Sequence, residues 1–157
     1  MKIGIITDSH WGARKGSKLF QDYFELFYKN VFFPTLEQYG ITTVIHMGDA
    51  FDSRKSIDYQ SFEWAKKVVF EPLSKYDVHM ITGNHDAWYK DTSEINSLSI
   101  LKGSSNLKIY DKIATRNYGG RTFTFCPWGT KIDDIPKSDV VVGHFELENF
   151  KMNAYKI

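Results

Sequence analysis

The stretch of sequence that decides the fold is Val44-Ile45-His46-Met47-Gly48-Asp49-Ala50-Phe51-Asp52. It begins as a largely apolar run with β-branched residues, which is typical of a buried strand, and its glycine marks the turn where the strand leaves the sheet. Asp49 and Asp52 therefore lie in a loop at the carboxyl end of a predicted strand.

The same order of strand and polar loop occurs at three more places in the chain. Residues 2–7 lead into Asp8-Ser9-His10, residues 78–82 lead into Gly83-Asn84-His85-Asp86, and residues 139–143 lead into His144. In α/β sheets the carboxyl ends of the strands line the ligand crevice. We therefore expect the first three loops to gather a metal-binding set, Asp8, His10, Asp49, Asn84 and His85, and His144 to join it from a loop further along.

Helical spacing of apolar residues separates the first three strands, which predicts an α/β fold. Residues 19–36 have this spacing, although Pro34 is expected to interrupt or kink the helix. A strand over residues 42–47 then completes a right-handed β-α-β unit. A second unit follows, with a helix over residues 58–71 that Pro72 closes and a strand over residues 77–82.

In the second half of the chain, the segments with helix-like or strand-like patterns are shorter. Residues 93–102 are expected to form a short helix capped by Ser93. Residues 107–110, 113–115 and 122–126 read as antiparallel strands of a second sheet, because turn signals separate them.

Length and composition favour a single well-packed domain. The chain has 157 residues, of which 42% are hydrophobic and 16% aromatic, so core-forming residues are plentiful. A formal net charge of +1 gives no global attraction to a polyanion, and Cys126, the only cysteine, cannot form an intramolecular disulfide. The chain enters a predicted strand at once and has no apolar run long enough for a membrane span, so we expect neither a signal peptide nor a span. We therefore expect a cytoplasmic protein.

Four motifs in this order, Asp-x-His, Gly-Asp-x-x-Asp, Gly-Asn-His-Asp and Gly-His, resemble those of the calcineurin-like metallophosphoesterase superfamily. The resemblance covers essentially the whole chain and implies a two-sheet sandwich flanked by helices, α/β/β/α, over residues 1–157. It also implies that the carboxyl-terminal part is incomplete. The family has a further Gly-His-x-His motif, whereas the thirteen residues after His144 contain no histidine.

The resemblance implies a two-metal site, in which paired cations acidify a water and bind the attacking and leaving oxygens. Asp49 would bridge the metals, Asp8 and His10 would bind the first, and Asn84 and His144 would bind the second. Carboxylate, imidazole and amide ligands without thiolate suit manganese and could accept magnesium, iron or zinc. Each metal would lack one histidine of the missing motif, so partial occupancy is expected.

Three further residues receive catalytic roles from the resemblance. His85 would protonate the leaving oxygen as general acid. Asp86 could hold the tautomer of His85 and raise its pKa, and Asp52 could orient a metal ligand. By contrast, His46 and His79 lie inside apolar strands and are interpreted as hydrogen-bonded core residues.

Basic and aromatic residues near the predicted loops allow two interpretations. Five basic side chains could either contact DNA phosphates or simply be exposed to solvent: Arg14, Lys15, Lys18, Arg54 and Lys55. Trp11, Trp88 and Tyr89 could stack on unpaired bases or serve packing.

Within the superfamily the motif wording is most similar to the branch of DNA nucleases that act in recombination and repair with a coiled-coil ATPase of the SbcC type. This likeness implies 3′–5′ exonuclease and single-strand endonuclease activity, DNA as partner, and a homodimer. We expect self-association through residues 58–71 and 88–102, where aromatics exceed the needs of one buried stripe. Two alternatives stay open: a phosphomonoesterase or cyclic-nucleotide phosphodiesterase on the same site, and a catalytically silent binding module.

Overall fold

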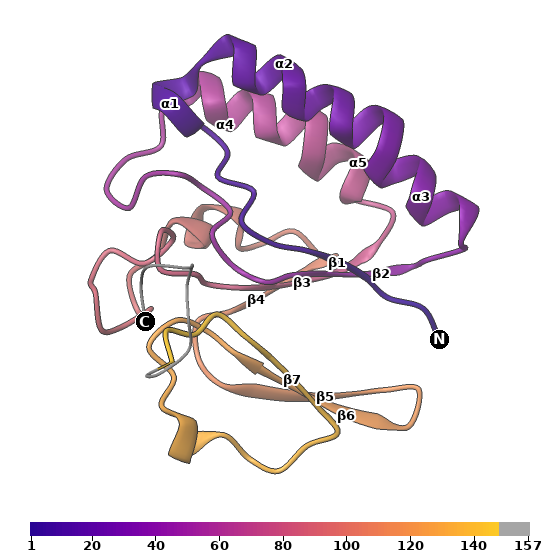
Figure 1. Cartoon of the computed structure of the whole chain (residues 1–157), viewed down its shortest axis with the longest axis vertical. Coiled ribbons are helices and arrows are strands. Elements are labelled where there is room, and N and C mark those ends of the chain that lie inside the picture. Colours follow the sequence, from indigo (N-terminus) through magenta and orange to yellow (C-terminus); the bar gives the residue numbers. More distant parts are fainter. Residues whose placement is uncertain (148–157) are drawn as a thin grey trace, which may run out of the picture.

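A parallel four-stranded sheet forms the middle layer of the computed structural model, which describes residues 1–147 (Figure 1). Its strands stand in the order β1 (Gly4–Ile6), β2 (Thr43–His46), β3 (Asp77–Ile81) and β4 (Leu107–Tyr110). Because all neighbours are parallel, the loops after β1, β2 and β3 emerge at one edge of the sheet. The predicted α/β fold with two β-α-β units is confirmed.

Two long helical segments cover one face of this sheet (Figure 1). The first runs through α2 (Lys18–Phe27), the π-helical turn η1 (Tyr28–Phe32) and α3 (Phe33–Gln38); the second runs through α4 (Tyr59–Ala65), η2 (Lys66–Phe70) and α5 (Glu71–Leu73). Each contains a proline two residues after the last residue of its π turn, Pro34 or Pro72. Proline has no N–H to bond the preceding turn, and a π turn is one way for a helix to accommodate this defect.

The core has two parts, one on each face of the parallel sheet. Between helices and sheet lie residues such as Tyr28, Leu36 and Val69, packed on Val44 and Met80. Between the two sheets lies a second cluster: Ile45, Ile81, Tyr110, Phe123, Phe125 and Val142. The parallel sheet is therefore buried on both faces, as parallel sheets normally are.

The second sheet consists of β5 (Ala114–Tyr118), β6 (Arg121–Cys126) and β7 (Val140–Gly143). β5 and β6 form an antiparallel hairpin, whereas β6 and β7 are parallel. Two expectations were wrong here: β4 belongs to the first sheet, and the second sheet is mixed. The connection from β3 is long enough to cross over and bring β4 back parallel to β3, and that from β6 does the same for β7.

Two further differences concern helices. Residues 97–101 form a 3₁₀-helix, η3 (Ser97–Leu101), and Ser93 does not cap it, because its hydroxyl donates to the Trp128 carbonyl at 2.7 Å. Within residues 1–147, α2 to α5 all lie on the first sheet, so the described layers are α/β/β (Figure 1). A search of the same residues found no helix with the length and apolar character that crossing a bilayer requires.

Candidate metal centre

The loops after β1 and β2 run side by side and are joined through their backbones. The amides of Asp8, His10 and Trp11 donate to the carbonyls of Gly48, Asp49 and Ala50 at 3.1, 3.1 and 2.8 Å. Asp8, His10 and Asp49 have φ of 51°, 44° and 54°, the left-handed region that non-glycine residues rarely occupy. Such strain is concentrated at functional sites, where it aims side chains that ordinary turns would direct elsewhere.

Two glycines allow the β2 and β3 loops to approach each other. A Cβ atom on Gly48 would lie 2.8 Å from both the Gly83 Cα and the His144 Nδ1. A Cβ atom on Gly83 would overlap the backbone and carboxylate of Asp49. Gly48 also has a φ of 96°, so glycine serves both conformation and close approach there.

The Asp86 side chain connects the same two loops through hydrogen bonds. Its carboxylate is buried and accepts backbone hydrogen bonds from Ala50 at 3.0 Å, Phe51 at 3.2 Å and Gly83 at 2.9 Å. Burial raises the pKa of this carboxyl, although the three amides oppose the shift. These contacts differ from the expected support of the His85 ring, because Asp86 binds backbone amides instead.

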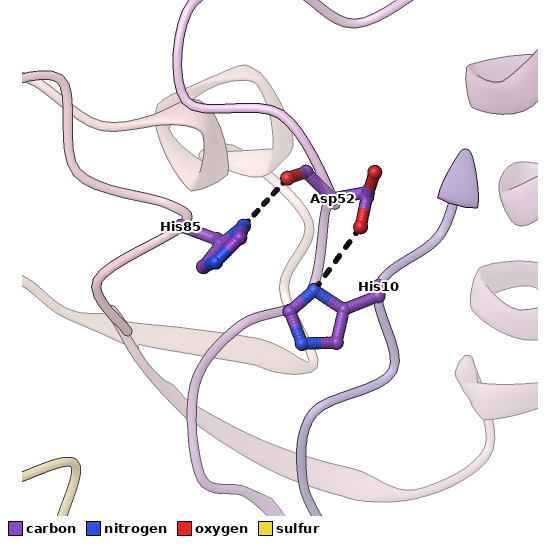
Figure 2. A group of neighbouring side chains, drawn as sticks. All are labelled: His10, Asp52 and His85. Atoms are coloured by element: carbon purple, nitrogen blue, oxygen red, sulfur yellow. Dashed lines mark hydrogen bonds and ion pairs between the residues drawn. The ribbon is translucent and has the colours of Figure 1, made fainter. Parts of the chain in front are cut away.

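The first group of candidate ligands is Asp8, His10 and Asp49, whose ligand atoms lie within 4.8 Å of one another. The His10 Nε2 atom is 3.8 Å from the Asp8 Oδ1 and 3.8 Å from the Asp49 Oδ2. The other ring nitrogen, Nδ1, faces the Asp52 Oδ1 at 3.5 Å (Figure 2). Asp52 thus lies beside the His10 ring, and the orienting role expected for it stays a prediction.

The second group joins Asp49 to Asn84 and His144. The His144 Nδ1 is 2.9 Å from the Met47 carbonyl, which can only accept, so Nδ1 donates there. The Nε2 atom lies 2.9 Å from the Asn84 Oδ1 and 3.6 Å from the Asp49 Oδ2. In the neutral tautomer of His144 with its hydrogen on Nδ1, these three atoms are all electron-pair donors, which is a set that a cation would satisfy.

Asp49 occupies the middle of the two groups. Its Oδ1 accepts the His85 amide at 2.7 Å, and its Oδ2 faces both imidazole nitrogens. The residue is only 3% exposed, and a buried carboxylate is costly unless cations or hydrogen bonds compensate its charge. The donors present thus fit divalent cations on either side of Asp49 Oδ2.

His85 stands beside the first group without joining its carboxylates. Its Nδ1 lies 2.6 Å from the Asp52 carbonyl and must donate to it, which leaves Nε2 free (Figure 2). The ring packs edge-on against His10, with centroids 4.7 Å apart. His85 and Asp52 also border a cleft of about 710 Å³ that is lined by Lys15, Arg54 and Lys55.

The structure separates the remaining basic and aromatic candidates. Lys15 and its neighbour Arg14 form a left-handed turn, α1 (Ala13–Gly16), with φ of 61° and 56°. Arg14 is exposed but does not line the cleft, and Lys18 is paired with Asp22 at 2.8 Å. Trp11 is only 2% exposed, so it serves core packing and cannot stack on a base. Lys55 lies over the ring of Trp88, with its Nζ 5.6 Å from the ring centroid.

The two strand histidines lie in the core. His46 is buried, with its Nε2 2.9 Å from the Ser9 hydroxyl, and burial lowers its pKa to about 4. His79 is fully buried, and its ring is 2.8 Å from the Tyr110 hydroxyl. Burial also lowers the His79 pKa.

A hollow on the His144 side of the centre was missed in the sequence. It has a volume of about 350 Å³ and is lined by Trp128, Lys90, Lys131 and His144, among others. Trp128 follows the carboxyl end of β6, a strand parallel to β7, which itself leads to His144. The strand-end rule that found the other loops would have included Trp128 had the parallel pairing of β6 and β7 been recognised.

The chain is similar in sequence to known proteins. The family model described as calcineurin-like phosphoesterase matches residues 1–153. Exonuclease subunit 1 of Enterobacteria phage T4 is 37% identical over 122 residues, which cover 71% of this chain and 36% of that protein. The chain thus spans about a third of that relative's length. A solved protein of unknown function from Aquifex aeolicus is 17% identical, with a TM-score of 0.41 over 78% of this chain and 58% of the other.

Proposed function

The chain belongs to the calcineurin-like phosphoesterase family, and we propose that it hydrolyses phosphodiester bonds of DNA with two divalent cations. The observation that carries the proposal is the position of Asp49 Oδ2, 3.8 Å from His10 Nε2 and 3.6 Å from His144 Nε2. One carboxylate oxygen between two imidazoles, with Asp8 and Asn84 beyond them, is a suitable donor set for two cations. Manganese is our first choice, since no thiolate takes part.

The proposed roles follow from the positions of the side chains. When bound, the cations supply positive charge to the phosphate and acidify the attacking water. Asp49 would be a ligand shared by the two cations, and Asp52 would fix the His10 ring through Nδ1. Asp86 would act indirectly, by holding the loops that carry Asp49 and His85.

His85 would serve the leaving group. As the water oxygen bonds to phosphorus, the bond from phosphorus to the leaving oxygen breaks, and that oxygen needs a proton. The His85 Nε2 is free to deliver it, because Nδ1 is committed to the Asp52 carbonyl. A second proton, from the attacking water, passes to solvent.

A polynucleotide substrate is supported by the cleft next to His85. Lys15, Arg54 and Lys55 line it and would hold phosphates of the strand on the leaving-group side. The phage relative is named as an exonuclease subunit, which makes DNA the first substrate to test. By the same likeness we propose a coiled-coil ATPase of the SbcC type as partner and a homodimer as the working form.

Single-stranded oligonucleotide and p-nitrophenyl phosphate, each assayed with manganese, test the function. We expect oligonucleotide hydrolysis to exceed that of the monoester, and Asp49→Asn to abolish both together with manganese binding measured by calorimetry. Preference for p-nitrophenyl phosphate would favour a small-molecule phosphomonoesterase. Oligonucleotide binding without manganese binding or turnover would mean a silent binding module.

A further inference from the structure

A second hollow borders the candidate metal centre at His144, and nothing in the proposed function uses it. His85 borders the larger cleft, and its ring centroid is 4.7 Å from that of His10. The His10 Nε2 is 3.8 Å from the Asp49 Oδ2, which in turn is 3.6 Å from the His144 Nε2. His144 in turn lines the hollow with Trp128, Lys90 and Lys131. The candidate centre therefore has a substrate-sized space on each side.

The hollow is a built feature of the fold, because two loops are fastened together around Trp128. The indole Nε1 donates to the Lys90 carbonyl at 2.7 Å, and the Trp128 carbonyl accepts from Ser93 at 2.7 Å. The Trp128 amide donates to the Thr82 carbonyl at the end of β3 at 2.8 Å. The ring is thus fixed before any ligand arrives, with its centroid 6.2 Å from that of His144.

The chemistry of the hollow suits a nucleotide. Trp128 offers a partly exposed aromatic face, and Lys90 and Lys131 are exposed cations beside it, opposed by one acid, Glu146. An aromatic platform combined with positive charge is how proteins bind single-stranded nucleic acid without reading its sequence. Phosphate alone would not require the indole.

Resting on the proposed function, we propose that Trp128, Lys90 and Lys131 form a subsite for the nucleotide that keeps the cleaved phosphate. His85 serves the leaving oxygen, so the leaving side of the strand occupies the larger cleft. The nucleotide on the other side of phosphorus must then lie toward His144, and its base stacks on Trp128. The substrate is therefore a strand that extends on both sides of the scissile bond.

Charge reversal at Lys131 tests the subsite, with Lys137→Glu as the matched control. Both lysines are exposed and lie in the same loop, but Lys137 does not line the hollow. Binding of a fluorescein-labelled oligodeoxythymidylate is measured by anisotropy in calcium buffer over a salt series. We expect Lys131→Glu to weaken binding about 5- to 10-fold and to lower the salt slope by about one, the value of one phosphate contact. The control should change affinity less than about twofold, as a distant charge does when screened.

Two more measurements separate the subsite from general effects. Trp128→Leu should weaken oligonucleotide binding about 10-fold or more and Trp128→Phe much less, because phenylalanine retains a stacking face. Hydrolysis of bis(p-nitrophenyl) phosphate with manganese should fall much less in Lys131→Glu than oligonucleotide binding does, since that small diester has no second phosphate for the lysine to contact.

Equal effects of Lys131→Glu and Lys137→Glu would overturn the subsite while leaving the nuclease proposal in place. Loss of bis(p-nitrophenyl) phosphate hydrolysis in Lys131→Glu would also overturn it, because the lysine would then act on the metal centre. If the unaltered chain hydrolyses the small diester but does not bind the oligonucleotide, the strand-binding subsite is refuted and phosphoesterase activity stands. Failure of the unaltered chain in both assays would refute the proposed function itself.

Discussion

His85 and the residues around it make different contributions that substitutions can separate. Its ring packs against His10, but its ring nitrogens make no contact with Asp8 or Asp49 among the described interactions, and only its backbone amide bonds to Asp49. We therefore expect His85→Ala to bind manganese normally and to lose turnover by ~10²-fold or more, since a general acid contributes about this factor. Calorimetry and oligonucleotide hydrolysis in one buffer measure both.

Asp8→Asn is the comparison for His85→Ala, because Asp8 belongs to the first ligand group and should lose both manganese affinity and turnover. A loss of manganese in His85→Ala would instead make His85 a ligand.

His46 illustrates a residue whose burial affects stability. Its folded-state pKa of about 4 lies below the ordinary value of 6.5, so the unfolded chain takes up the proton first as the pH falls. The contribution of His46 to the free energy of unfolding is therefore fully present above pH 6.5. It decreases as the pH falls from there toward pH 4, by up to about 1.4 kcal/mol per pH unit. Urea unfolding in EDTA at pH 7, 6 and 5 should show a shallower pH slope in His46→Gln. An unchanged slope would show that His46 is not the group responsible.

Asp86 acts at the scale of whole loops. Removal of its carboxylate leaves the amides of Ala50, Phe51 and Gly83 buried without acceptors, and each unsatisfied group costs about 1–3 kcal/mol. We expect Asp86→Ala to lower the free energy of unfolding by about 3 kcal/mol or more, measured in urea. Asp52→Ala, a change of a partly exposed residue in the β2 loop that Asp86 holds, should cost much less. Similar losses would show that Asp86 does not act as a clamp.

The left-handed turn α1 carries strain beside the larger cleft. The left-handed conformation costs a non-glycine residue about 1–2 kcal/mol in the folded state. A glycine avoids this strain, but it loses more conformational entropy on folding, which cancels part of the benefit. Lys15→Gly should thus raise the free energy of unfolding by about 0.5–1 kcal/mol yet weaken oligonucleotide binding, as expected when strain serves a site. Lys18→Gly, at the first position of the right-handed α2, should not stabilise the chain. Destabilisation by Lys15→Gly would remove strain as the explanation.

Which elements could be foreseen depends on how local their causes are. The strands before Asp8, Asp49 and Asn84 follow from short-range pattern, and the parallel sheet then brings their loops together. The sheet membership of β4 does not, because a run such as Leu107 to Tyr110 fits either a parallel or an antiparallel neighbour. Asp86 could be placed near the site but not given its partners, since three amides from two loops converge on it only in the folded chain.

At the scale of the whole molecule, several large apolar side chains within residues 1–147 are exposed to solvent. Tyr59, Trp88 and Tyr89 are 90%, 43% and 49% exposed, whereas Phe62 and Trp64 pack on the core. A separate exposed row follows α2: Leu19, Tyr23 and Leu26 at 77%, 71% and 59%. Rows of exposed apolar residues such as the one on α2 are typical of interaction surfaces.

We expect self-association through Tyr59, Trp88 and Tyr89, and Trp88 lies next to the larger cleft because it contacts Lys55, which lines that cleft. Two copies paired there would bring two clefts to one interface, so that both could act on one DNA molecule. Tyr59→Glu should then yield monomers in sedimentation equilibrium at tens of micromolar, because a buried unpaired carboxylate opposes association. Leu26→Glu on the α2 row is the matched control and should leave dimers intact. The reverse result would move the interface to α2, and monomers in the unaltered chain would exclude a dimer through either surface.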